Sequence, residues 1–482
     1  MATAEKFESE QAWPALRLLG RPAGVLLFIY GVLLFAGERL LRDPDTFWHI
    51  AAGNWIWSHQ GIPATDPFSF SMAGAPWTAH EWLAELILAG AYDALGWTGV
   101  VMITALAIAI AFAVLGEALL RVLSPLAALP LIGAAFYLAA GHLTARPHAL
   151  ALPILVLWAA ALLKARREQC VPPLTLLPLM TLWANLHAGF VAGLGLAGLF
   201  AAEALLMAPS RAERLVQLRR WSLFVTGAAL ASLLNPHGLA LWRFPLELMS
   251  NPFALSFVGE WHAPDFSRIQ PVEIFLLALL ALLARLRLRL PWTRLFLLLG
   301  LVHMALGHAR NAELLALLTP LLLAEPIAAA WPLGAVVPAP PRSRAIALPL
   351  LLLALASGVA LARGYPHDES AIAPRRALEA AEQAGLAGPV LNDFDFGGYL
   401  IFEGVPPLVD GRIDLFGDAF LRDYAAALAA SGDALPRILD RYHITWALLE
   451  PSTPAAAALA RMPDWQRLYG DDIAVVYRQR RP

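Results

Sequence analysis

The chain has 482 residues, of which 59% are hydrophobic and only 15% are charged. Soluble domains carry roughly 25% charged residues, so this composition, with its repeated long apolar runs, excludes a soluble enzyme, and it also excludes a disordered chain. The 35 basic and 37 acidic residues leave a net charge of −2, which provides no field to attract nucleic acid. Cys170 is the sole cysteine, so no internal disulfide is expected.

The first apolar run, 22–37, is followed by charged residues rather than a small-residue cleavage site, so we interpret it as a retained membrane span. The segment 81–96 is apolar but interrupted by acids, which favours an interfacial helix. Counting 22–37, we expect about eleven spans. The other runs lie near 98–119, 125–141, 149–163, 171–186, 189–207, 221–234, 271–284, 294–307, 312–330 and 345–362.

The basic residues are concentrated in the segments on one side of these spans. Loops rich in arginine and lysine stay in the cytoplasm, so we predict a cytoplasmic N-terminus and, after an odd number of spans, a tail on the other side. The abundance of Ala, Leu and Arg is typical of a bacterial protein. The predicted location is therefore the bacterial inner membrane, with a periplasmic C-terminal domain.

Residues 364–482 have the composition of a soluble domain, and we place the boundary between a membrane domain (1–363) and a C-terminal domain there. A Pro-rich linker is expected at 332–343. Helical patterns near 374–385, 418–430, 434–442 and 454–462, and strand patterns near 389–392, 398–402, 445–449 and 473–478, predict a small α/β fold.

Polar side chains gather at one side of the predicted spans. Any single cluster is explained well by interfacial anchoring, and Asn-Pro-His-Gly (235–238) is also a good turn. Because ionisable groups near a membrane are costly, all the clusters together predict the rim of one polar cavity. They comprise Asp43, Asp45, His49, His80, Glu81, Arg146, His148, Asn185, His187, Asn235, His237, Glu260, His262, Asp265, His308, Arg310 and Asn311.

The first loop, 38–97, is the most informative segment. Asp45 and His49 are four residues apart and share a helix face. Asp43 suits the N-cap of that helix, which leaves Asp45 free for another role. Glu81 has two equally good interpretations, as a functional acid and as part of a capping box with Thr78.

The arrangement of one span, an acidic loop opening, interfacial helices and many further spans resembles the polytopic GT-C glycosyltransferases. That superfamily has an acidic motif followed by a His-Pro-Pro or Lys-Pro-Pro segment. The matching positions are Asp45, Trp48 and His49 for the first motif, and His80, Glu81 and Trp82 for the second. Thr46 replaces the second acid of the family motif, and no Pro-Pro follows His80.

Several longer segments resemble a set of bacterial membrane proteins related to the same superfamily. These segments are DPDTFWHIAAGNWI, LWANLHAGF, SLLNPHGL, EWHAPDF, HARN, DFDFGGYL and DGRIDLFG. The resemblance implies an all-α polytopic bundle with a small C-terminal α/β domain. It implies a transferase that moves a sugar from a polyprenyl-phosphate donor to a glycan, lipid or protein acceptor.

The same resemblance implies roles for the clustered residues. Asp45 would be the general base, supported by His49 and Glu81, and Arg146 and Arg310 would bind the donor phosphate. In the tail, Asp393, Asp395, Tyr399 and Arg412 are candidates for carbohydrate contacts. The clustered residues that would also contact substrate are Asp43, His80, His148, Asn185, His187, Asn235, His237, Glu260, His308 and Asn311.

A divalent metal is possible, since acids and histidines cluster in the first loop, but no HxxxH or HExxH spacing occurs and we expect no metal to be required. Two rival functions are a transporter and a non-catalytic membrane scaffold or sensor. Dispersal of Asp45, His80, Arg146 and Arg310 would favour the scaffold, whereas convergence on one cavity would favour the transferase.

Overall fold

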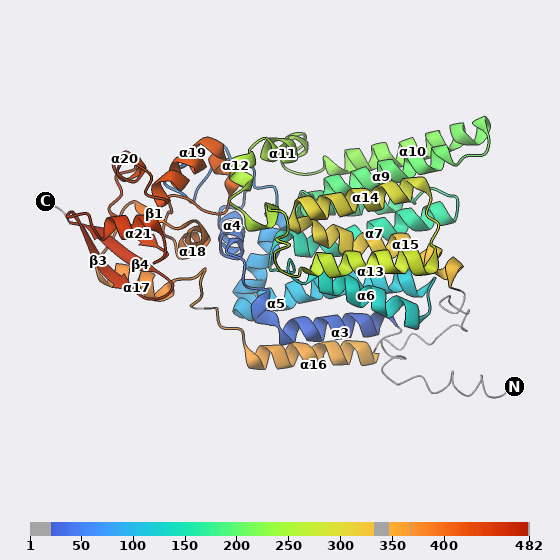
Figure 1. Ribbon diagram of the computed structural model, residues 1–482, viewed down its shortest axis with the longest axis horizontal. Helices are drawn as coiled ribbons and strands as arrows, with labels where there is room; N and C mark the ends of the chain where they lie inside the picture. Colours follow the sequence, from blue (N-terminus) through green and yellow to red (C-terminus); the bar gives the residue numbers. More distant parts are fainter. Residues whose placement is uncertain (1–20, 332–346, 368, 481–482) are drawn as a thin grey trace.

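The computed structural model describes residues 21–331, 347–367 and 369–480. In these ranges the protein is mostly helical. Long, roughly parallel helices form a bundle along the long axis, and a smaller C-terminal domain with a sheet lies at one end of it (Figure 1). The end of the bundle next to that domain is called the domain-facing end, and the opposite end the far end. The predicted linker 332–343 lies outside the described residues.

The bundle helices follow the apolar runs of the sequence. Proline stands in the first turn of several of them, where its missing N–H leaves no helical hydrogen bond unmade. The helices are α3 (Pro22–Phe35), α5 (Trp82–Leu120), α6 (Pro125–Ala139), α7 (Pro147–Arg167), α8 (Leu177–Leu186), α9 (Phe190–Leu206), α10 (Arg211–Ser232), α13 (Pro271–Leu286), α14 (Trp292–Gly307), α15 (Ala312–Ala330) and α16 (Ala347–Arg363).

Among the described residues, three helices are long and apolar enough to cross a membrane: α5, α7 and the segment Ala309–Ala330, which contains α15. Other helices at the predicted runs are shorter apolar helices of 10–17 residues. Length and hydropathy therefore support a membrane-associated helical protein.

The two helices predicted at 81–96 and 98–119 are present and together carry the label α5; a kink at Gly96 separates them. The bend is possible because Gly96 adopts φ 60° and ψ −151°, a conformation that other residues rarely reach. The first part of α5 packs on α4 (Asp45–His59), the helix of the first loop. There Gly53 lies so close to the Glu85 carbonyl that a Cβ would collide with it.

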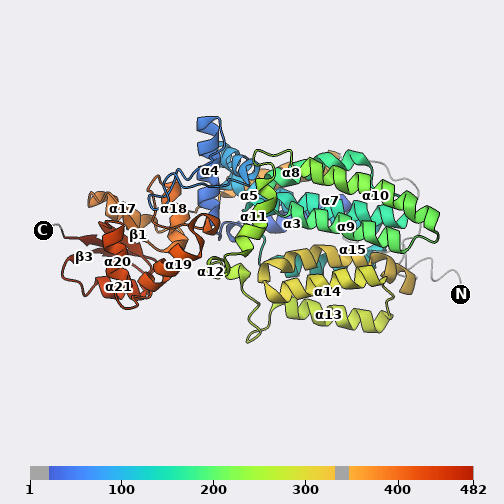
Figure 2. The same cartoon turned by 90° about the horizontal axis from the view of Figure 1, so that it is seen from above.

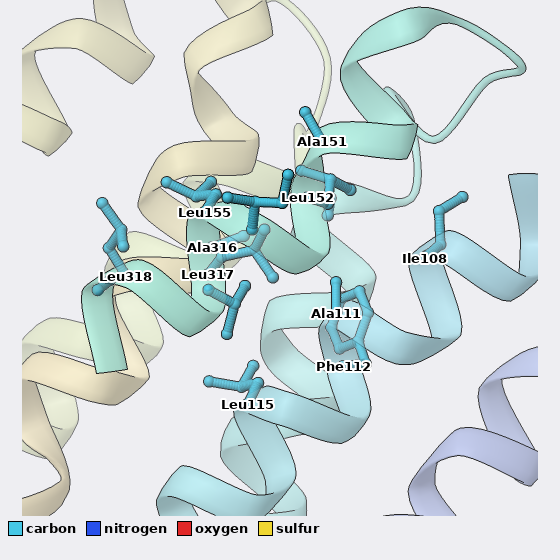
Figure 3. Close-up of a cluster of buried hydrophobic side chains, with 14 of the residues drawn as sticks. Ile108, Ala111, Phe112, Leu115, Ala151, Leu152, Leu155, Ala316, Leu317 and Leu318 are labelled. Atoms are coloured by element: carbon cyan, nitrogen blue, oxygen red, sulfur yellow. The ribbon is translucent and has the colours of Figure 1, made fainter. Parts of the chain in front are cut away.

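The centre of the bundle is a continuous apolar core. Figure 3 shows its interior where α5, α7 and α15 meet, with side chains from all three helices pointing toward one another. The labelled residues are Ile108, Ala111, Phe112, Leu115, Ala151, Leu152, Leu155, Ala316, Leu317 and Leu318.

A group of charges centred on buried Glu203, the far-end ion cluster, joins four helices at the far end. Glu203 on α9 accepts from Arg166 on α7 at 3.3 Å and from Arg294 on α14 at 3.4 Å. Arg294 also contacts Glu325 on α15 at 3.2 Å, and Arg167 lies 3.9 Å from the same acid. Both acids thus have two guanidinium partners.

The C-terminal domain contains a four-stranded sheet with the order β1-β2-β4-β3. The β1–β2 pair is parallel, and the other two pairs are antiparallel. The elements are α17 (Arg375–Gln383), β1 (Val390–Asn392), α18 (Gly397–Phe402), α19 (Ile413–Leu428), α20 (Ala434–Arg441), β2 (Trp446–Leu449), α21 (Pro454–Leu459), β3 (Trp465–Gly470) and β4 (Val475–Gln479).

One predicted strand was wrong, and one strand of the sheet was not predicted. The predicted strand 398–402 is the helix α18, whose apolar residues are buried on several sides and so lack a helical pattern of polar positions. Gly397 and Gly398 allow close packing of this helix: a Cβ on Gly397 would meet the Val409 carbonyl and one on Gly398 the Pro44 carbonyl. The strand β3 was missed because it is a half-exposed edge strand with a register shift between Arg467 and Tyr469.

The C-terminal domain is fixed to the first loop rather than tethered loosely. Phe47 on α4 packs edge-on against Tyr399 and Phe402 of α18, with ring centroids 5.3 and 5.5 Å apart. Fully buried Arg412 joins Asp66 of the loop to Asp410 of the domain, at 2.6 Å in each case. The first loop and the domain therefore form one packed unit above the domain-facing end.

Candidate functional site

A cavity of about 400 Å³ lies where the bundle, the first loop and the C-terminal domain meet. Its walls come from α4, α7, α14, the start of α15 and the start of α19, and from α11 (Ala240–Met249) and the 3-10 turn η3 (Gly259–Trp261). Figure 2 shows α11 and α12 (Pro252–Leu255) between the bundle and the domain. The predicted site residues among its lining are Asp45, His80, Glu81, Arg146, His148, His187, Glu260, Arg310, Asn311 and Arg412.

One side of the cavity, the arginine arc, consists of Asp45, Arg146, Glu260 and Arg310. Asp43, a predicted substrate contact, does not line the cavity and reaches the arc only through Arg146. Arg146 Nη2 lies 2.8 Å from Asp45 Oδ2, and Nη1 lies 3.3 Å from both Asp43 Oδ2 and Glu260 Oε1. The same Glu260 oxygen is 3.4 Å from Arg310 Nη1, and the Arg310 guanidinium stacks 4.5 Å above the Trp261 ring. Glu260 Oε1 therefore bridges the two arginines.

The start of α4 positions Asp45 in this arc. Asp43 Oδ1 accepts the Asp45 backbone N–H at 3.1 Å, so Asp43 stabilises the helix start as predicted and also contacts Arg146. The Trp48 indole N–H donates to Asp45 Oδ1 at 3.0 Å. Burial raises the pKa of the Asp45 carboxyl to about 7, although Arg146 favours the ionised form. A carboxyl with this pKa exchanges protons readily near neutral pH.

The pKa of Glu260 is shifted in the opposite direction from that of Asp45. Burial alone would raise its pKa, but the guanidinium groups of Arg146 and Arg310 outweigh burial and lower the pKa to about 2. Glu260 is therefore a carboxylate at neutral pH, and its oxygen marks a point at which one anion is held by both arginines.

The other side of the cavity, the histidine arc, consists of His80, Glu81, His148, His187 and Glu313. Glu81 Oε1 lies 3.6 Å from His80 Nε2 and 3.5 Å from His187 Nε2. Glu313 Oε2 lies 3.7 Å from His148 Nε2. Burial raises the pKa of Glu81 to about 7 and lowers the pKa of His187 well below its usual range.

The capping-box interpretation of Glu81 was wrong. Glu81 stands at the N-cap of α5, but no side-chain capping bond is made there, and its carboxyl group faces histidines instead. At this helix start Thr78 forms a hydrogen bond through its backbone carbonyl, which accepts the His80 backbone N–H, and not through its hydroxyl. The sequence pattern is typical of a capping box, but the Glu81 side chain lines the cavity instead of capping the helix.

His49 lies behind the cavity wall rather than in it. It is fully buried, with Nε2 3.8 Å from Glu81 Oε2 and Nδ1 3.5 Å from Glu85 Oε1. Burial lowers its pKa well below the usual range, so the ring is neutral at neutral pH. The prediction that His49 is catalytic needs correction: its ring does not line the cavity and reaches it only through Glu81.

Several other predicted contacts lie outside the cavity lining, although all are within the described residues. Their polar side chains form hydrogen bonds with backbone groups instead. The Asn185 amide bonds the carbonyls of Thr181 and Leu234, and its oxygen accepts the Trp82 indole N–H. Asn235 forms the expected turn. His237 bonds the Ala79 carbonyl, and His308 bonds the Trp261 carbonyl.

The tail residues are placed differently from what we predicted. Asp393, Asp395 and Tyr399 do not line the cavity; Tyr399 is buried against Phe47, and Asp393 accepts the Asp395 N–H. Arg412 lines the cavity, but both ends of its guanidinium are bound by Asp66 and Asp410. Its position indicates a structural role.

The C-terminal domain nevertheless contributes directly to the cavity. Gly411 lies against the Asp45 carboxyl group so closely that a Cβ would collide with Oδ1. Asp414 lines the cavity beside the histidine arc, and burial raises the pKa of its carboxyl group. The segment Asp410–Asp414 is therefore part of the site, not a distant cover.

The lining also includes residues that we did not single out as candidates. His142 and Glu313 contribute polar groups, and Trp183 and Trp261 contribute aromatic ones. Glu313 could have been noticed, because it is an acid at the start of an otherwise apolar helix. The two tryptophans carry no such signal in an apolar chain.

In the part of the chain that the structure describes, no three His, Cys, Asp or Glu side chains are grouped as ligands for one metal ion. No protein-family model and no curated protein matches this chain. The candidate site therefore has to be interpreted from its own geometry and chemistry.

Proposed function

We propose that the protein is a multi-pass membrane glycosyltransferase with about eleven crossings. It transfers a sugar from a polyprenyl-phosphate donor to a hydroxyl of a glycan, lipid or protein acceptor. The N-terminus lies in the cytoplasm of a bacterium and the cavity opens at the periplasmic face of the inner membrane. The observation that carries the proposal is a single cavity in which a carboxyl group, two arginines and an apolar wall meet.

The apolar wall of the cavity suits the lipid part of such a donor. Leu152 and Leu155 of α7 and Leu314 of α15 line it. Met249 on α11 and Met304 on α14 also line the cavity, yet they are 62% and 41% exposed. The cavity therefore reaches the protein surface beside these two flexible apolar side chains, where a lipid chain would enter.

The arginine arc suits the phosphate part of the donor. Arg146 and Arg310 both contact one Glu260 oxygen, at 3.3 and 3.4 Å, so their guanidinium groups already converge on one anionic atom. A donor phosphate oxygen would replace Glu260 at this point. Arginine binds phosphate well because its planar group presents several donors.

Asp45 then acts as the general base. An ionised carboxylate offers about four lone pairs, so Asp45 retains acceptor capacity beyond its bonds to Trp48 and Arg146. Asp45 takes the proton of the acceptor hydroxyl while that oxygen attacks the anomeric carbon. The bond from this carbon to the phosphate oxygen breaks, and the phosphate leaves with the electron pair, stabilised by Arg146 and Arg310.

The convergence of Asp45, His80, Arg146 and Arg310 on one cavity supports a transferase over a scaffold. The polar groups lie at helix ends on one side of the bundle, whereas transporters typically bind substrate near the membrane midplane. The resemblance of the first loop to the GT-C glycosyltransferases agrees with this assignment.

The proposal is tested in the organism that encodes the protein. A deletion strain is complemented with the wild type, with Asp45→Asn or with Asp265→Asn, an exposed acid of a neighbouring loop that serves as the matched control. We expect the wild type and Asp265→Asn to restore a cell-surface glycan, measured by mass spectrometry. Asp45→Asn should leave the glycan absent and the lipid-linked sugar accumulated, and full restoration by this variant would refute the assignment.

A further inference from the structure

The histidine arc differs from the arginine arc in having no fixed cation. Among the described residues, Glu81 and Glu313 have only histidine rings within ion-pair distance, at 3.5 to 3.8 Å. These rings are buried, and a buried imidazole favours its neutral form. Within ion-pair distance the two acids therefore have no arginine or lysine, although Arg146 and Arg310 act on Glu81 from farther away.

Glu313 is the clearest case. It is only 7% exposed, lines the cavity, and its Oε1 has no hydrogen-bond partner. A buried polar atom without a partner is costly, by about 1–3 kcal/mol and more for a charged group. Asp414 adds a third acid to the same side of the cavity. The arrangement is unfavourable when empty and becomes favourable when a cation with several donors enters.

Aromatic side chains line the same part of the cavity. The Phe244 ring lies 4.0 Å from the His80 ring, and Trp183 belongs to the helix that ends at His187. Aromatic faces attract organic cations, and they also stack on sugar rings. Acids, neutral imidazoles and aromatic rings together form the surroundings that suit a primary ammonium group, which has three donors and no acceptor.

We propose that the histidine arc binds a protonated primary amine carried by a sugar, so that the substrate class of the cavity is an amino sugar. Glu313 and Glu81 accept from the ammonium group, and Trp183 and Phe244 cover it. The proposal rests on the proposed function only in taking the amine to be attached to a sugar.

The test uses the purified full chain in lipid nanodiscs and three probes with the same alkyl chain. These are octyl 2-amino-2-deoxyglucoside, its N-acetyl derivative and octyl glucoside, and binding is measured by calorimetry. We expect the free amine to bind at least about tenfold more tightly than the other two. Glu313→Gln and, independently, Glu81→Gln should abolish this preference, whereas Glu247→Gln, an exposed acid on α11, should retain it.

The outcomes separate this proposal from the proposed function. Equal affinities for the three probes, or a dissociation constant above about 1 mM for the amine, would overturn the amine site. A preference that survives in both Glu313→Gln and Glu81→Gln, with both variants folded by thermal unfolding, would overturn it too. Donor cleavage that depends on Asp45 would leave the transferase intact in either case. Selective amine binding without donor cleavage would leave the amine site and remove the transferase.

Discussion

The two ends of the helical bundle bury charges in contrasting ways. In the far-end ion cluster, Glu203 and Glu325 each have two guanidinium partners, and no residue of the cluster lines the cavity. At the domain-facing end, acids outnumber arginines and surround about 400 Å³ of open space. Acids that are fully paired with arginines have no free acceptor for a ligand, whereas acids in excess of arginines around a cavity are available to bind one. The comparison separates charges that hold helices together from charges that remain available to a ligand.

The largest expected effect falls on stability at the far end. Glu203→Gln removes the acid shared by Arg166 and Arg294, and breaking a buried ion pair costs about 3–5 kcal/mol. Chemical unfolding in detergent should show this loss. The control Glu117→Gln breaks only an exposed pair with Arg121 and should cost less than about 1 kcal/mol. Equal effects of the two variants, or lost activity per folded molecule in Glu203→Gln, would remove the contrast between the two ends.

A smaller effect is expected at the arginine arc, and it should appear in substrate binding rather than in stability. Arg310→Ala removes one of the two groups that converge on Glu260 Oε1. Hydrogen bonds to charged groups contribute about 1.5–3 kcal/mol, so the donor KM should rise by roughly tenfold or more. Arg268→Ala, an exposed arginine in the preceding loop, is the matched control. An unchanged donor KM in Arg310→Ala would rule out the phosphate role.

Asp45 should make stability and activity depend on pH in opposite directions. The pKa of Asp45 is raised from its ordinary value of 3.8 to about 7, so the folded protein holds this proton more tightly than the unfolded chain. Its favourable contribution to stability is full below about pH 3.8 and is lost as the pH rises through about 7. Activity should change in the opposite direction, falling about tenfold per unit below pH 7 because the base must be ionised. A rate that is flat from pH 5 to 8 would contradict the role of Asp45.

Much of the arrangement could be predicted because burying charge is costly. Asp45, Glu81, Arg146 and Arg310 stood out in an apolar chain, and the structure brings all four to one cavity. Three of the four strands were also predictable: β1, β2 and β4 occur close to the alternating or fully apolar runs.

The misplaced predictions share a physical cause, which is that helix ends need polar groups for their own unpaired backbone. Asn185, His237 and His308 looked like site residues because they occur at helix ends on the correct side. Each instead bonds a nearby or facing carbonyl. From sequence alone, a side chain that donates a hydrogen bond to a backbone carbonyl cannot be distinguished from one that faces a cavity.

The contribution of the C-terminal domain could not be predicted for a different reason. Arg412 and Asp66 are 346 residues apart, and only the folded chain shows that they form one buried pair. The same contact brings Gly411 against Asp45. Long-range contacts of this kind leave no local pattern in the sequence.

The central claim is that the domain-facing cavity cleaves a lipid-linked sugar by means of Asp45. In the most direct test, the purified chain in lipid nanodiscs is incubated with a polyprenyl-phosphate sugar and an acceptor. The amount of polyprenyl phosphate released is measured by mass spectrometry. We expect release with the wild type and a loss of about 10²–10⁴-fold with Asp45→Asn, at unchanged thermal stability. Equal release by the two proteins would contradict the claim.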